Sequence, residues 1–127
     1  MPREPVQCPH VPPAAGPYSS AMVYNGVAFL SGQGPHDSSG RLAGDDITSQ
    51  TRQVFQNLAA VAESAGTDLR RAVQVRVFLT SMEHFAGMNE VYAEFFDEPY
   101  PARTTVQTGL PLPGMLVEID AAVALTD

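Results

Sequence analysis

Arg103 and Glu118 are the two residues whose types and positions best fit a chemical site. Arg103 opens a short strand-like run after the turn Tyr100-Pro101-Ala102, and Glu118 lies on the polar side of the last strand-like run. A guanidinium binds a carboxylate through two parallel hydrogen bonds, and a partly buried glutamate carries protons near neutral pH. If neighbouring strands bring the two side chains together, they form an anion receptor beside a proton carrier. If they lie apart, both are ordinary surface charges.

Other kinds of site have little support in the sequence. His10, His36 and His84 have none of the spacings typical of metal ligands, and Cys8 lies alone in a proline-rich leader without a recognisable catalytic partner. No glycine-rich loop of a nucleotide-binding type is present. All seven basic residues are arginines, which excludes a Schiff-base lysine and a lysine-bound pyridoxal cofactor. We therefore expect neither a metal nor a cofactor.

Length and charge restrict the class of protein. The 127 residues fit a single domain, 1–127, whose core needs no disulfide or metal. Fourteen acidic and seven basic side chains give a net charge of −7, which makes a nucleic-acid partner unlikely because phosphate binding needs a basic surface. No apolar run approaches the ~20 residues of a membrane span, and the N-terminal residues lack the apolar stretch of a secretory signal. We expect a cytoplasmic protein with no membrane partner.

Two helices and five strands must position these residues. The apolar spacing predicts one helix from Ile47 to Ala65, with two aspartates before it and Gly66 as its stop. A second helix is predicted to begin at the capping-box pattern Thr80-Ser81-Met82-Glu83 and to end before Pro99. The proline-rich first seventeen residues are expected to be extended or turn-like. The strand-like runs are Ala21–Tyr24, Val27–Gln33, Val73–Leu79, Arg103–Thr108 and Leu116–Leu125.

The order of these elements predicts an α+β fold, a mixed sheet with both helices packed on one face. Asn25-Gly26 predicts a hairpin between the first two strands. Alternation in the last strand turns its apolar residues toward the helices and places Glu118 and Asp120 on the opposite face. The run Val27–Leu30 is apolar on both faces, yet two helices can cover only one. We therefore expect the uncovered face to mediate self-association.

A series of short motifs runs along nearly the whole chain. In order they are Gly16-Pro17-Tyr18-Ser19, Phe29-Leu30-Ser31-Gly32-Gln33, Gln50-Thr51, Asn57-Leu58, Gly66, Val77-Phe78-Leu79, Phe85, Met88-Asn89-Glu90-Val91-Tyr92, Phe95-Phe96, Pro101-Ala102-Arg103-Thr104-Thr105-Val106, Leu110-Pro111 and Leu116-Val117-Glu118-Ile119. Together they resemble the RidA/YjgF family of enamine/imine deaminases, a family also labelled endoribonuclease L-PSP. The Pro101–Val106 and Leu116–Ile119 segments, at this separation, are its most specific part.

This resemblance implies a chorismate-mutase-like fold that assembles as a homotrimer around a central barrel, with sites in clefts between neighbouring subunits. It also implies that Arg103 binds the substrate carboxylate and that Glu118 is catalytic. The positions that match residues lining or shaping the cleft are Tyr18, Ser31, Gly32 and Asn89. Many members have a cysteine two residues after the arginine. Here Thr105 stands at that position, and it could hydrogen-bond the substrate together with the backbone near Gly32.

The implied reaction is hydrolysis of 2-enamine/2-imine acids of the 2-aminoacrylate type to 2-keto acids and ammonia, without a cofactor. Three alternatives stay open at this point. The chain could be a deaminase dedicated to an aminomuconate-type or natural-product intermediate, or a small-ligand-binding trimer without turnover. It could also have the ribonuclease activity written into the family's other label, which the acidic charge disfavours.

Overall fold

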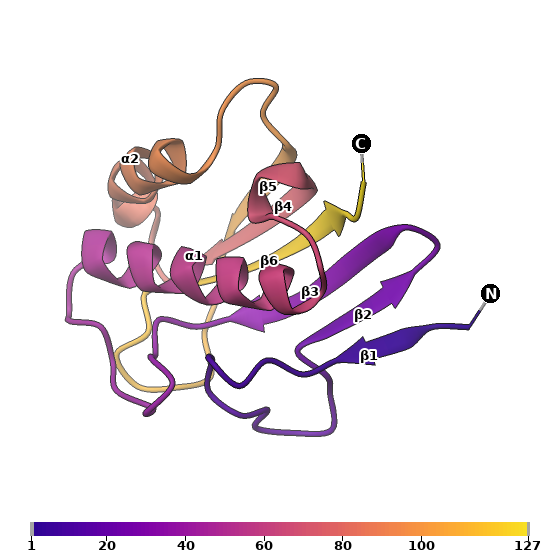
Figure 1. Ribbon diagram of the computed structural model, residues 1–127. Coiled ribbons are helices and arrows are strands. Elements are labelled where there is room, and N and C mark those ends of the chain that lie inside the picture. Colours follow the sequence, from indigo (N-terminus) through magenta and orange to yellow (C-terminus); the bar gives the residue numbers. More distant parts are fainter. Residues whose placement is uncertain (1, 127) are drawn as a thin grey trace.

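The computed structural model describes residues 2–126 and consists of one six-stranded sheet and two helices (Figure 1). The strands are β1 (Glu4–Val6), β2 (Ala21–Tyr24), β3 (Val27–Gln33), β4 (Ala72–Leu79), β5 (Ala102–Gln107) and β6 (Val117–Ala124), and the helices are α1 (Ile47–Ser64) and α2 (Phe85–Phe95). Short 3₁₀ turns, η1 (Leu69–Arg71) and η2 (Met82–His84), precede β4 and α2. The strands are ordered β1-β2-β3-β6-β4-β5, and every neighbouring pair is antiparallel except β4 with β5. The expected mixed sheet is confirmed.

The first helix begins and ends within one residue of the predicted positions. Asp46 caps α1 by accepting a hydrogen bond from the Ser49 N–H at 2.9 Å, and Gly66 follows the helix with a φ of +87°. The start of the second helix differs from the prediction. Ser81, one residue after the expected capping threonine, accepts from the Glu83 N–H at 3.1 Å, and the first turn is 3₁₀, so α2 itself begins at Phe85.

The strands follow the predicted runs, with one addition. Asn25 and Gly26 have φ values of +51° and +81°, the pair of positive angles that a two-residue hairpin between β2 and β3 requires. The addition is β1, which lies within the leader and pairs antiparallel with β2. Pro5 at its centre has no N–H to donate, so the strand fits only at the sheet edge. Because the proline-rich segment was expected to be irregular, β1 was not predicted.

The core lies between the helices and one face of the sheet. Alternate residues of β6 are buried, and they pack against α1, which crosses β3 and β6 in Figure 1. α2 packs against α1 on this same side and connects the parallel strands β4 and β5. The outer face of the sheet has no helix over it, and Phe29 there is 51% exposed. The predicted uncovered apolar surface is thus present, while self-association stays a prediction. Among residues 2–126, no helix is long and apolar enough to cross a membrane, and the cytoplasmic location also stays a prediction.

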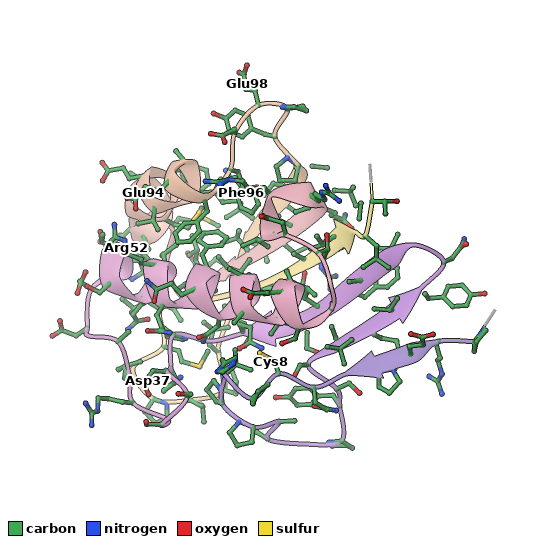
Figure 2. All side chains as sticks on the ribbon, viewed as in Figure 1. Cys8, Asp37, Arg52, Glu94, Phe96 and Glu98 are labelled. Atoms are coloured by element: carbon green, nitrogen blue, oxygen red, sulfur yellow. The ribbon has the colours of Figure 1, made fainter. Side chains whose placement is uncertain are left out.

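Cys8 anchors the leader to the core and gives a first test of the fold. Its side chain is 7% exposed, it belongs to the hydrophobic cluster, and its N–H donates to the Ser20 hydroxyl at 3.2 Å (Figure 2). Cys8→Ser would bury a hydroxyl among apolar groups, and we expect it to lower the free energy of unfolding by about 1–3 kcal/mol. Urea unfolding of both proteins measures this difference. An unchanged midpoint would show that the Cys8 side chain does not contribute to the core.

Candidate functional site

Arg103 lies against α2, on the helix side of the sheet. In the parallel pairing of β5 with β4 it is aligned with the buried Val75, so both side chains face the helices. The Arg103 Nη1 donates to the Asn89 side-chain oxygen at 2.7 Å. Its guanidinium carbon lies 4.7 Å from the centre of the Tyr92 ring and 5.6 Å from that of the Phe85 ring. One face of α2 therefore lines one side of the guanidinium, and the residue as a whole stays exposed.

The charge of Arg103 has no acidic partner within residues 2–126, unlike that of three other arginines. Those three form the pairs Arg52–Glu94 at 2.9 Å (Figure 2), Arg70–Asp97 at 3.8 Å and Arg76–Asp120 at 2.7 Å. In a chain with a net charge of −7, an arginine that keeps its charge free of carboxylates is a ready binding group for an anion.

Glu118 lies on the outer face, half-buried, in the wall of a cavity of about 410 Å³. Burial raises the pKa of its carboxyl above the ordinary value of 4.5, and the negative charge of Asp120 raises it further. A Cβ on Gly32 would lie 2.7 Å from the Glu118 Oε2, so a side chain at this position would displace the carboxylate from where it lies. Tyr18 lines the same cavity. The arrangement provides a carboxyl group that holds its proton more readily than one in water.

The leader forms much of this cavity, which sequence analysis did not foresee. Residues 12–15 line it, together with His36 and the apolar side chains of Leu112 and Met115. The Tyr18 hydroxyl accepts a hydrogen bond from the Ala15 N–H at 3.2 Å, which holds the leader turn in place. A cluster of prolines indicates only irregular chain, so no local signal could have placed these residues beside Glu118.

Arg103 and Glu118 do not meet within one chain. β4 lies between their strands, and Glu118 is paired with Phe78 on the outer face, while Arg103 faces the helices. The other expected residues divide in the same way. Asn89 contacts Arg103 beside α2, whereas Tyr18 and Gly32 lie with Glu118. The single chain therefore presents the candidate residues in two groups on opposite faces of the sheet, which we call candidate half-sites.

Two expected residues have more particular positions. The Ser31 hydroxyl donates to the Ser19 carbonyl at 2.6 Å, so it joins β3 to the segment before β2, in a hollow beside Tyr18. Thr105 is aligned with the buried Val77 on the helix side, and its buried hydroxyl has no hydrogen-bond partner within the described chain. Residues 2–126 contain no group of three or more potential metal ligands placed to hold an ion.

Comparisons with known proteins agree on one family. The family model described as endoribonuclease L-PSP matches residues 8–125. RutC family protein y4sK of Sinorhizobium fredii is 40% identical over 124 residues, 97% of this chain and 98% of that protein. The crystal structure of YyfA, a Rid-family protein from Yersinia pestis, has a TM-score of 0.91 and 36% identity, and the match covers 97% of this chain and 99% of that one. That of E. coli TdcF with bound serine has a TM-score of 0.88 and 31% identity, covering 95% and 98%.

The raised pKa of Glu118 predicts how stability depends on pH. Between pH 4.5 and its higher folded-state pKa, the folded protein binds more protons at Glu118 than the unfolded chain does, so this group lowers the free energy of unfolding as pH rises. Glu118→Gln removes the effect. We expect the variant to be more stable than the wild type at neutral pH, with the difference shrinking as pH falls. Thermal unfolding from acidic to neutral pH measures it, and parallel curves would contradict the assignment.

Proposed function

The chain belongs to the family described as endoribonuclease L-PSP, and we propose that it hydrolyses reactive 2-enamine/2-imine acids to 2-keto acids and ammonia. The family resemblance found in the sequence is thereby confirmed, including its relation to Rid proteins. The observation that carries the proposal is Arg103, a guanidinium without an acidic partner in residues 2–126, because it fits the carboxylate that such substrates share. The serine bound to TdcF, itself an amino-acid carboxylate, supports this substrate class.

The chemistry requires little more than positioning and one proton carrier. An enamine of the 2-aminoacrylate type tautomerises to an imine, whose carbon becomes electrophilic when the nitrogen is protonated. Water adds to that carbon and forms a carbinolamine, and cleavage of the C–N bond then releases ammonia and leaves the 2-keto acid. Such imines already hydrolyse in water, so the site needs to lower the activation barrier by only a few kcal/mol. Each ~1.4 kcal/mol of lowering increases the rate tenfold. This hydrolysis involves no change of oxidation state and needs neither a metal nor a redox cofactor.

Glu118 is the proposed proton carrier. As a carboxylate it accepts a proton from the attacking water, and as a carboxylic acid it returns a proton to the departing amine. Its raised pKa suits both steps, since the protonated form persists closer to neutral pH than in an exposed glutamate. Gly32 allows the carboxylate to lie against the β3 backbone, and the backbone N–H near Gly32 is the second donor that we assign to the substrate.

We further propose that the complete site forms between two copies of the chain, in a homotrimer. Arg103 with Asn89 would come from one subunit and Glu118 with Tyr18 and Gly32 from its neighbour. Two observations support this assembly: the two half-sites face opposite ways, and the outer face carries the exposed ring of Phe29. A head-to-tail interface that closes into a ring joins two different faces of the same protein in this way.

The direct test is release of 2-keto acids from enamines generated in the assay by an amino-acid dehydratase or oxidase. A general deaminase accelerates release across a panel of amino acids, whereas an enzyme dedicated to one intermediate responds to few of them. Rates equal to the buffer control would overturn the proposal. Calorimetric binding of serine without turnover would then assign a ligand-binding role, and cleavage of an RNA probe would assign the activity in the family's description.

Arg103→Lys separates a carboxylate clamp from an ordinary surface charge. Lysine keeps the charge but lacks the planar fork, so the substrate is held loosely relative to Glu118 and water. We expect kcat/KM for 2-imino acids to fall by about tenfold or more, with a larger loss for Arg103→Ala. The melting temperature should stay nearly unchanged. Imines without a carboxylate serve as the control, because they should be poor substrates whose rates neither variant alters.

Mixing two inactive variants tests the site between subunits. Arg103→Ala and Glu118→Gln should each abolish most activity while they still assemble. When equal amounts are unfolded and refolded together, random assembly gives about one quarter of interfaces an intact Arg103 from one subunit and an intact Glu118 from the next. We therefore expect about one quarter of wild-type activity. If the mixed sample is as inactive as the separate variants, the site does not combine Arg103 and Glu118 from different subunits. Native mass spectrometry measures the number of subunits.

A further inference from the structure

We propose that Tyr92 is the positioning residue for Arg103: its ring holds the guanidinium where it can bind the substrate carboxylate, and Phe85 assists. This inference rests on the proposed role of Arg103. The residues concerned lie on one face of α2, since Phe85, Asn89 and Tyr92 are spaced by four and three residues. Two of them offer rings and one offers an oxygen, and all three contact the same guanidinium.

The Tyr92 ring is itself firmly held. It is 7% exposed and packs on Phe55, with ring centres 5.6 Å apart in an edge-to-face arrangement, and on Phe96 at 4.7 Å. Phe55 and Phe96 are both core residues. An exposed arginine side chain has several rotatable bonds and no fixed position of its own, so a ring anchored in the core supplies the rigidity that Arg103 lacks.

This support leaves the guanidinium free for a ligand. Its N–H bonds lie in its plane, so a ring packed against it uses none of these donors. Nη1 donates to the Asn89 oxygen at 2.7 Å and to the Met88 sulfur at 4.0 Å, so both polar contacts with α2 are made at one of the three nitrogens. A carboxylate in place of the ring would fix the arginine equally well, but it would neutralise the charge and compete with the substrate. An aromatic face attracts the cation and carries no net charge. The ring therefore positions Arg103 without occupying it.

The ring of Tyr92, and not its hydroxyl, carries this role. The hydroxyl is buried and has no hydrogen-bond partner within residues 2–126. It therefore neither orients Arg103 nor bonds to a neighbouring side chain in the described structure. Replacing tyrosine by phenylalanine should accordingly retain the positioning, whereas leucine, which has no aromatic face, should lose it.

The experiment compares Tyr92→Leu with Phe95→Leu. Phe95 lies on the same helix and stacks on the same Phe55 ring, with ring centres 5.0 Å apart. Within residues 2–126 the Arg103 guanidinium lies over the Phe85 and Tyr92 rings and not over that of Phe95. Both variants remove one ring from the same cluster, so their losses of thermal stability should be similar. Binding is measured by calorimetry with pyruvate, a 2-keto acid product, and with pyruvamide, its neutral analogue.

For Tyr92→Leu we expect the Kd for pyruvate and the KM for 2-imino acids to rise about fivefold or more, with pyruvamide binding unchanged. Tyr92→Phe should restore pyruvate binding to near the wild-type value. Phe95→Leu should alter pyruvate binding by less than about twofold. Equal pyruvate affinity in Tyr92→Leu and the wild type, or equal losses in Tyr92→Leu and Phe95→Leu, would overturn the proposal.

Phe85→Leu protects the test against a failure to fold. The Phe85 ring is 38% exposed and lies farther from the guanidinium, so its loss should leave the fold intact and weaken pyruvate binding by about threefold, more than in Phe95→Leu. If Tyr92→Leu does not fold, an unchanged pyruvate Kd in Phe85→Leu overturns the proposal. The proposed function can fail separately. If the wild-type protein binds pyruvate in preference to pyruvamide but does not hydrolyse imines, the positioning role of Tyr92 stands and the deaminase proposal is overturned. Wild-type protein that does not bind pyruvate overturns both.

Discussion

The pairing of β4 with β6 on one side and with β5 on the other determines to which face of the sheet the side chains of Arg103 and Glu118 point. Residues of a strand alternate between faces, and paired residues share a face. Arg103, aligned with Val75, therefore faces the helices, and Glu118, paired with Phe78, faces outward. A shift of either register by one residue would reverse these directions and expose the core residues of that strand. Burial of the core thus fixes both half-sites.

The two half-sites treat their charges in opposite ways. Arg103 stays exposed and is supported by rings and an amide oxygen, so its positive charge is not neutralised. Glu118 is half-buried beside a second carboxylate, Asp120, and the cost of holding a negative charge there appears as its raised pKa. A protein optimised only for stability would pair the first and expose the second. Departures of both kinds are typical of functional sites.

The leader has a larger part than its composition suggests. Its first strand, β1, extends the sheet, Cys8 joins the core, and residues 12–15 form a wall of the cavity around Glu118. Hydrogen bonds from Ala15 to Tyr18 and from Ser31 to Ser19 hold the segment that follows. Proline restricts the chain without supplying N–H donors, so the leader's position depends on these few contacts and on burial.

The sequence by itself determined what neighbouring residues decide: the existence of both helices and, within one or two residues, the extent of α1, the Asn25-Gly26 hairpin and three further strands, because caps, turns and apolar spacing act over a few positions. Its motifs also indicated the family and singled out Arg103 and Glu118 as the two principal candidate residues. Only the tertiary structure decided that β4 separates Arg103 from Glu118, that the leader walls the cavity, and that Tyr92 lies beneath the guanidinium. These facts follow from strand order and from packing between segments far apart in the chain. The spacing of residues within one segment determines neither.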